Sequence, residues 1–122
     1  MSAFLTSLQV EPASEHDDGL WRLTAEFVYA SDVLGKVVTV PAGFVTDFAS
    51  VPRIPIAYEL TGNTSTEASV IHDYLYKTTT ICTRQQADAV LKEASAVTGV
   101  PAWRRNAMWL AVRLFGGSHW GT

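Results

Sequence analysis

The chain alternates between apolar and polar side chains along Trp21-Arg22-Leu23-Thr24-Ala25-Glu26-Phe27-Val28-Tyr29. A period of two predicts a β-strand that places its aromatic face on the core. A turn-rich stretch at residues 31–35 and a β-branched run at 36–40 follow, so we expect an antiparallel hairpin. Residues 4–10 are a third strand candidate. The first half of the chain therefore predicts an antiparallel sheet.

The second half predicts helices. Thr83-Arg84-Gln85-Gln86 has the spacing of a capping box, in which the Thr83 hydroxyl and the Gln86 amide each bind a backbone N–H of the first turn. Apolar residues then recur at helical spacing, and Gly99 is placed to end this helix. The members of this stripe are Ala87, Val90, Leu91 and Ala94.

Two further helices are expected, at residues 66–77 and from Pro101 to the pair Gly116-Gly117. The predicted buried stripe of the last helix is Trp103, Ala107, Leu110, Ala111 and Leu114. Trp109 lies beside this stripe and is the better candidate for a partly exposed contact residue. Strands followed by helices predict one α+β domain over residues 1–122, with three to four antiparallel strands packed against about three helices.

Composition excludes several classes of protein. Nine Lys+Arg against twelve Asp+Glu give a net charge of −3, which argues against a basic groove for nucleic acid. The single cysteine, Cys82, excludes an internal disulfide and a cysteine-based zinc site. The apolar runs are too short to span a membrane, and the N-terminus shows no pattern of a signal peptide.

Polar side chains gather in two motifs between these halves. Val40-Pro41-Ala42-Gly43-Phe44-Val45-Thr46-Asp47-Phe48-Ala49-Ser50-Val51-Pro52-Arg53 ends a strand and enters a loop, where Thr46, Asp47, Ser50 and Arg53 can converge. Ile71-His72-Asp73-Tyr74-Leu75-Tyr76 lies on the first predicted helix. Because His72 and Tyr76 are four residues apart, they share one helix face.

These two motifs, with TRQQADAVLKEAS at residues 83–95 and MWLAVRLFGG at residues 108–117, resemble the DUF1353 family over about residues 36–117. The resemblance implies a bacteriophage or prophage origin, and the family name itself declares an unknown function. By position, the family's polar signature falls on a set of residues in the two motifs and on the following helix. That set is Asp47, Ser50, His72, Asp73, Tyr76 and Asp88.

One interpretation of this set is metal-dependent hydrolysis. Asp47 and His72 would bind a divalent ion such as zinc or manganese, and Asp73 would be a third ligand or would orient the imidazole. Ser50 and Tyr76 would orient a substrate, for which the phage resemblance favours the bacterial cell wall. Two other readings are a Ser50 nucleophile activated by His72, and Asp47 with Asp73 as acid and base on a glycosidic bond.

The alternative is a hydrogen-bond network without catalysis. A buried His-Asp pair with a tyrosine hydroxyl can satisfy its own polar groups while holding a helix in place. Asp88, one step off the apolar stripe of its helix, is expected to be a network or ion-pair partner rather than a ligand. The protein would then be a tail, baseplate or assembly component that contacts other virion proteins, located in the virion or the host cytoplasm.

Overall fold

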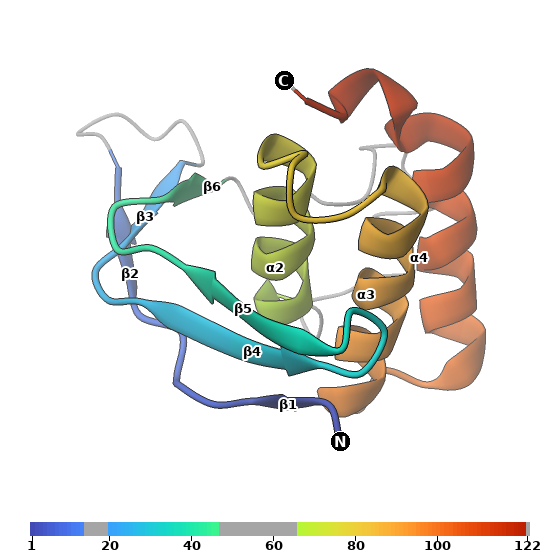
Figure 1. Cartoon of the computed structure of the whole chain (residues 1–122), viewed down its shortest axis with the longest axis horizontal. Helices are drawn as coiled ribbons and strands as arrows, with labels where there is room; N and C mark the ends of the chain where they lie inside the picture. Colours follow the sequence, from blue (N-terminus) through green and yellow to red (C-terminus); the bar gives the residue numbers. More distant parts are fainter. Residues whose placement is uncertain (14–19, 47–65, 122) are drawn as a thin grey trace.

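The computed structural model describes residues 1–13, 20–46 and 66–121. Within these ranges the strands are β1 (Ala3–Phe4), β2 (Val10–Pro12), β3 (Trp21–Leu23), β4 (Phe27–Ser31), β5 (Lys36–Val40) and β6 (Val45–Thr46). The helices are α2 (Thr66–Lys77), α3 (Arg84–Val97) and α4 (Ala102–Phe115), followed by the 3-10 helix η1 (Gly116–His119). The predicted α+β fold is confirmed, although the described strands form two small sheets rather than one (Figure 1).

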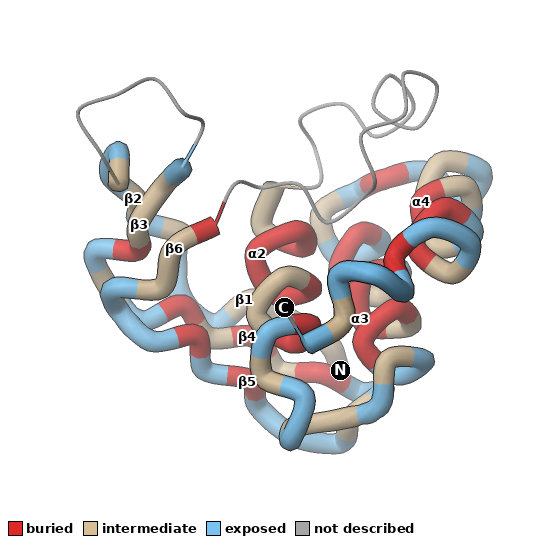
Figure 2. Tube along the Cα trace, turned by 90° about the horizontal axis from the view of Figure 1, so that it is seen from above, coloured by how far each residue is buried: buried red, intermediate tan, exposed pale blue. Residues whose placement is uncertain are grey.

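Both sheets are antiparallel and have three strands, in the orders β1-β4-β5 and β2-β3-β6. The helices α2 and α3 lie between these sheets and α4, which packs on the far side of α3 (Figures 1 and 2). Figure 2 shows the buried positions concentrated on α2 and α3 and on β4 and β5. The core therefore lies between the β4–β5 hairpin and the first two helices.

The alternating stretch at residues 21–29 was predicted as one strand, and this is wrong. The chain bends after Leu23, so β3 pairs with β2 and β6 while β4 pairs with β1 and β5. The bend is fixed because the Thr24 N–H donates to the Gln9 carbonyl at 2.9 Å and the Leu23 N–H donates to the Phe44 carbonyl at 2.9 Å. The alternation survives the bend, since Leu23, Phe27 and Tyr29 are all buried.

The third strand candidate, residues 4–10, is also divided, with β1 ending at Phe4 and β2 beginning at Val10. The ladder to β4 stops because the Val28 N–H donates to the Thr6 side-chain hydroxyl at 3.0 Å instead of to a backbone carbonyl. Phe4 nevertheless packs on the core, with its ring centroid 5.4 Å from that of Phe27 and 4.6 Å from that of Tyr29.

The helices α2 and α3 form where the sequence predicts them. Both bonds of the capping box are present: the Gln86 N–H donates to Thr83 Oγ1 at 3.1 Å, and the Thr83 N–H donates to Gln86 Oε1 at 2.9 Å. Gly99 follows the helix with a φ of 89°, a backbone conformation that glycine adopts without a steric penalty. Local signals were sufficient here because each of these bonds joins residues within one turn.

Glu93 ties α3 to the hairpin formed by β4 and β5. Its carboxylate accepts from the Tyr29 hydroxyl at 2.9 Å, the Ser31 hydroxyl at 2.7 Å and the Val33 N–H at 2.9 Å. Burial and, after it, the bond to Glu93 raise the pKa of Tyr29 above its ordinary range, so the phenol stays a donor. These contacts fix the position of α3, which carries Asp88.

The predicted buried stripe of α4 is wrong in its rotation. Ala111 is buried as expected, but the other buried members of α4 are Met108 and Val112. Trp103, Leu110 and Leu114 instead expose half or more of their surface. Met108 and Val112 pack in the core with residues of α2 and α3, and the contact of Arg113 with the buried Asp88 carboxylate at 2.7 Å holds α4 in this orientation. Trp109 is half-buried, as expected, with the Lys92 ammonium 5.7 Å from its ring centre.

Candidate functional site

The predicted site residues His72 and Tyr76 lie together inside the protein. Both project from one face of α2, and their ring centroids are 4.2 Å apart. His72 is 1% exposed and Tyr76 is 4% exposed, so the fold removes both from water. Helical spacing predicted the shared face, and the structure confirms it. Their common partner is a carboxylate on the neighbouring helix α3.

That carboxylate belongs to Asp88, which is 0% exposed. Asp88 Oδ1 lies 2.8 Å from His72 Nε2 and accepts from the Tyr76 hydroxyl at 2.5 Å. Asp88 Oδ2 accepts from Arg113 Nη1 on α4 at 2.7 Å. Ionised carboxylates only accept, so Nε2 must carry the proton of the His72 ring when Asp88 is charged. The expectation that Asp88 is a network partner is confirmed.

Arg84 extends the same group of contacts to the end of α4. Its Nε donates to the Tyr76 hydroxyl at 3.2 Å, while Nη2 donates to the carbonyls of Val112 at 2.6 Å and Arg113 at 3.0 Å. Both carbonyls belong to the last turn of α4, where a cation suits the helix dipole, and the Val112 carbonyl also accepts from the Gly116 N–H. The residues His72, Tyr76, Arg84, Asp88 and Arg113 are called the Asp88 network below.

Electrostatics keep Asp88 ionised and His72 neutral. Burial acts to raise the pKa of Asp88, but the hydrogen bonds from His72, Tyr76 and Arg113 outweigh it and hold that pKa below its ordinary value. Burial is the main cause that lowers the pKa of His72, against the opposing attraction of Asp88. Burial and then Asp88 raise the pKa of Tyr76, so its hydroxyl remains a donor. One buried anion therefore meets one charged donor, Arg113, and two neutral donors.

Asp73 lies beside His72 in the chain but has different surroundings. It is partly buried, and its Oδ2 is 3.6 Å from the Lys77 ammonium one turn further along α2. The carboxylate that binds His72 Nε2 is that of Asp88 rather than that of Asp73. At this nitrogen, the partner that orients the imidazole is therefore Asp88, sixteen positions after His72.

The other two predicted site residues, Asp47 and Ser50, lie outside the described residues. Within the described ranges, no three His, Cys, Asp or Glu side chains are arranged to hold a metal ion. Because Asp47 was one of the three predicted ligands, the zinc or manganese site stays a prediction. The described helices also include none that is long and apolar enough to cross a membrane.

Sequence reasoning missed the two arginines of the network. A signal existed for Arg84, which precedes Asp88 by four residues on α3 and therefore shares its helix face. No comparable signal existed for Arg113, since its contact with Asp88 joins two helices separated by a turn.

A family model described as "Protein of unknown function (DUF1353)" matches residues 21–112. The match covers more than half of the chain, so the chain belongs to the DUF1353 family, as its motifs predicted. It includes four of the five residues in the Asp88 network and also includes Asp47 and Ser50. No curated protein and no solved structure matched the chain.

The network makes stability depend on pH through His72. The pKa of an unfolded histidine is near 6.5, and the folded value is lower, so the unfolded chain binds more protons just below that pH. We therefore expect His72 to have no effect on the pH dependence of the free energy of unfolding well above pH 6.5. Below that pH, the free energy of unfolding should fall as the pH drops. A second fall, from the lowered pKa of Asp88, begins near pH 4.

Urea unfolding at a series of pH values measures both falls. His72→Gln keeps an N–H donor for Asp88 but does not titrate, so it should remove the fall that begins near pH 6.5 and leave the one near pH 4. His119→Gln is the matched control, because it makes the same substitution at an exposed histidine outside the Asp88 network. An unchanged first fall in His72→Gln would contradict the assignment.

Gly116 is required where η1 passes over Tyr76. A Cβ atom at this position would lie 2.9 Å from the Tyr76 hydroxyl oxygen, closer than real Cβ contacts. That hydroxyl cannot move without losing its bond to Asp88. We expect Gly116→Ala to lower the free energy of unfolding by about 1–3 kcal/mol.

Gly117→Ala provides the control, because its Cβ would have ordinary contacts, the nearest at 3.5 Å from Arg84. Chemical unfolding of both variants and of the parent measures the two changes in the free energy of unfolding. Equal stability of Gly116→Ala and Gly117→Ala would show that Tyr76 is not held where the structure places it.

Proposed function

We propose that this DUF1353 protein is a non-catalytic component of a bacteriophage particle or of its assembly. The observation that supports the proposal is the burial of His72 and Asp88, in which His72 Nε2 binds Asp88 Oδ1 at 2.8 Å away from water. A catalytic base or a metal ligand must reach a substrate, a water molecule or an ion. The network instead joins α2, α3 and α4 and has the properties of a structural support.

The competing function is a metal-dependent hydrolase that acts on the cell wall. In that mechanism His72 Nε2 could bind an ion only by releasing Asp88, which would lose one of its three donors. A buried carboxylate that loses a partner is destabilised by a few kcal/mol. The structural role is favoured because it needs no such exchange.

Metal addition distinguishes the two functions. For a structural network, zinc or manganese should leave the melting temperature of the parent unchanged, and Asp47→Asn should behave like the parent. A ligand that binds only the folded state raises the melting temperature by mass action. A saturable rise that Asp47→Asn abolishes would contradict the proposal and support the hydrolase.

The structural role also predicts the effect of His72→Ala. Removal of the imidazole leaves Asp88 with fewer donors, so we expect a loss of about 2–4 kcal/mol in the free energy of unfolding. His72→Gln keeps a hydrogen-bond donor for Asp88, so its free energy of unfolding should fall by clearly less than that of His72→Ala. An unchanged or raised stability of His72→Ala would indicate a functional site held at a cost to stability.

The assembly role itself is tested on particles. The chain should be found by quantitative mass spectrometry in purified phage particles or in their assembly intermediates, at a fixed ratio to a structural protein. Digestion of purified cell walls by the parent protein, lost in His72→Gln, would refute the non-catalytic role directly.

A further inference from the structure

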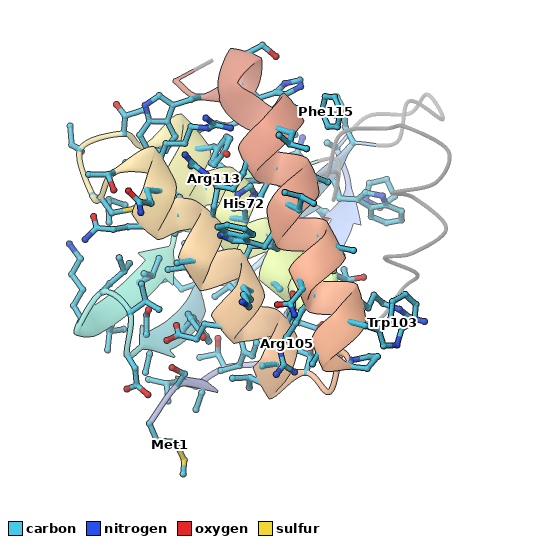
Figure 3. The ribbon with its side chains drawn as sticks, turned by 90° about the vertical axis from the view of Figure 1, so that its right-hand side faces the viewer. Met1, His72, Trp103, Arg105, Arg113 and Phe115 are labelled. Carbon is cyan, nitrogen blue, oxygen red and sulfur yellow. The ribbon has the colours of Figure 1, made fainter. Side chains whose placement is uncertain are left out.

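The helix α4 has an apolar face that points away from the core. Met108 and Val112 are buried against the rest of the protein, whereas Trp103, Leu110 and Leu114 are 58%, 50% and 65% exposed. In Figure 3, Trp103 lies on the side of α4 opposite to α3, while Arg113 lies between the two helices. The helix therefore carries one apolar face for its own core and a second one that faces outward.

The outward residues follow the spacing of a coiled-coil contact. Trp103, Ala107, Leu110 and Leu114 are separated by alternating steps of four and three residues, the repeat that keeps one stripe of a helix facing another helix. These four residues are called the outer seam. Ala107 is small, which lets a second helix approach closely at the middle of the seam. Such a repeat indicates a helix as the partner.

The outer seam can form the apolar centre of an interface. The exposed parts of Trp103, Leu110 and Leu114 present a surface of roughly 350 Å². A standard interface buries about 800 Å² on each partner, of which a little over half is apolar. The seam can thus supply most of the apolar surface of one such interface.

The charges on α4 allow it to pair with itself. The helix has Arg104, Arg105 and Arg113 and no acidic residue. Arg113 is held by Asp88, and Arg105 donates to the Val100 carbonyl at 3.1 Å, so these two cations bind their own chain. The Arg104 guanidinium lies 5.4 Å from the ring centre of Trp103 at one end of the seam.

An antiparallel pair also separates the like charges. In that arrangement the positions that flank one side of the seam meet the same side of the second helix. Arg104 of one copy then faces Ala111 of the other, and Arg113 faces Asn106. Like charges at opposing positions would be unfavourable, and the antiparallel order avoids them.

We propose that two copies of this chain associate through the outer seam, with α4 packed antiparallel on α4 about a two-fold axis. A two-fold interface uses the same patch on both copies, and the seam is a self-complementary patch of this kind. The inference does not depend on the virion role proposed above, because it rests on the exposure and spacing of α4 alone.

Sedimentation velocity of the full chain over a hundredfold range of concentration tests the proposal. The mass should rise from the monomer value of 13.3 kDa toward twice that value. Leu110→Glu should weaken the dimer at least a hundredfold, because it puts two charges into the seam. Leu5→Glu is the matched control: Leu5 is similarly exposed, at 58%, but lies between β1 and β2, so its dimer should persist.

Three results would overturn the dimer. The parent could remain at 13.3 kDa throughout, which would leave the seam to a different protein or to water. Leu5→Glu could weaken association as much as Leu110→Glu does. Leu110→Glu could also melt several degrees below Leu5→Glu at a concentration where both are monomers, which would show that the chain covers the seam itself.

Discussion

The carboxylate of Asp88 is the group on which the arrangement of the three helices depends. It is buried on α3, and its hydrogen bonds reach His72 and Tyr76 on α2 and Arg113 on α4. An ionised carboxylate away from water is tolerated only when it is paired and fully hydrogen-bonded. The positions of α2 and α4 are therefore set by the requirement to deliver donors to one point. Arg84 and Gly116 fit around the same point, since Arg84 donates to the Tyr76 hydroxyl and a side chain at Gly116 would collide with it.

This constraint explains why a motif that resembles catalytic chemistry need not be catalytic. A histidine next to an aspartate, followed by a tyrosine, suggests a reactive site when the chain is considered alone. In the fold, the histidine turns to a different aspartate, and both become part of the interior. At the surface, α4 presents a second apolar face: Met108 and Val112 face the core, whereas Trp103 and Leu110 face outward and leave the outer seam for a partner.

The features that could be predicted from sequence are those fixed within a few residues. The helix bounds at Thr66 and Lys77 and the capping box at Thr83 depend on local spacing and local hydrogen bonds, and they were predicted correctly. The bend after Leu23 could not be predicted, because it depends on bonds from Leu23 and Thr24 to distant segments. The apolar alternation correctly predicted which side chains of β3 and β4 are buried, although it could not show where one strand ends.

The site was predictable in part for the same reason. His72 and Tyr76 share a face by helical spacing, and Asp88 was expected to be a network partner. The predicted rotation of α4 was wrong because the larger stripe of apolar residues was assigned to the core, whereas Trp103, Leu110 and Leu114 face outward. The ion pair between Arg113 of α4 and the buried Asp88 carboxylate of α3 joins two helices, and a contact of this kind leaves no periodic signal in the sequence. The roles of Asp47 and Ser50, outside the described residues, remain predictions.

The free energy of unfolding of Asp88→Asn is the most direct test of this account, with Asp32→Asn as the control. Asparagine keeps the shape of Asp88 but removes the charge that Arg113 neutralises, so the account predicts a loss of about 3 kcal/mol or more. Asp32 binds the N-terminal amine and is 64% exposed, so Asp32→Asn should remain close to the parent. Equal stability of the two variants would contradict the claim that Asp88 holds the three helices together.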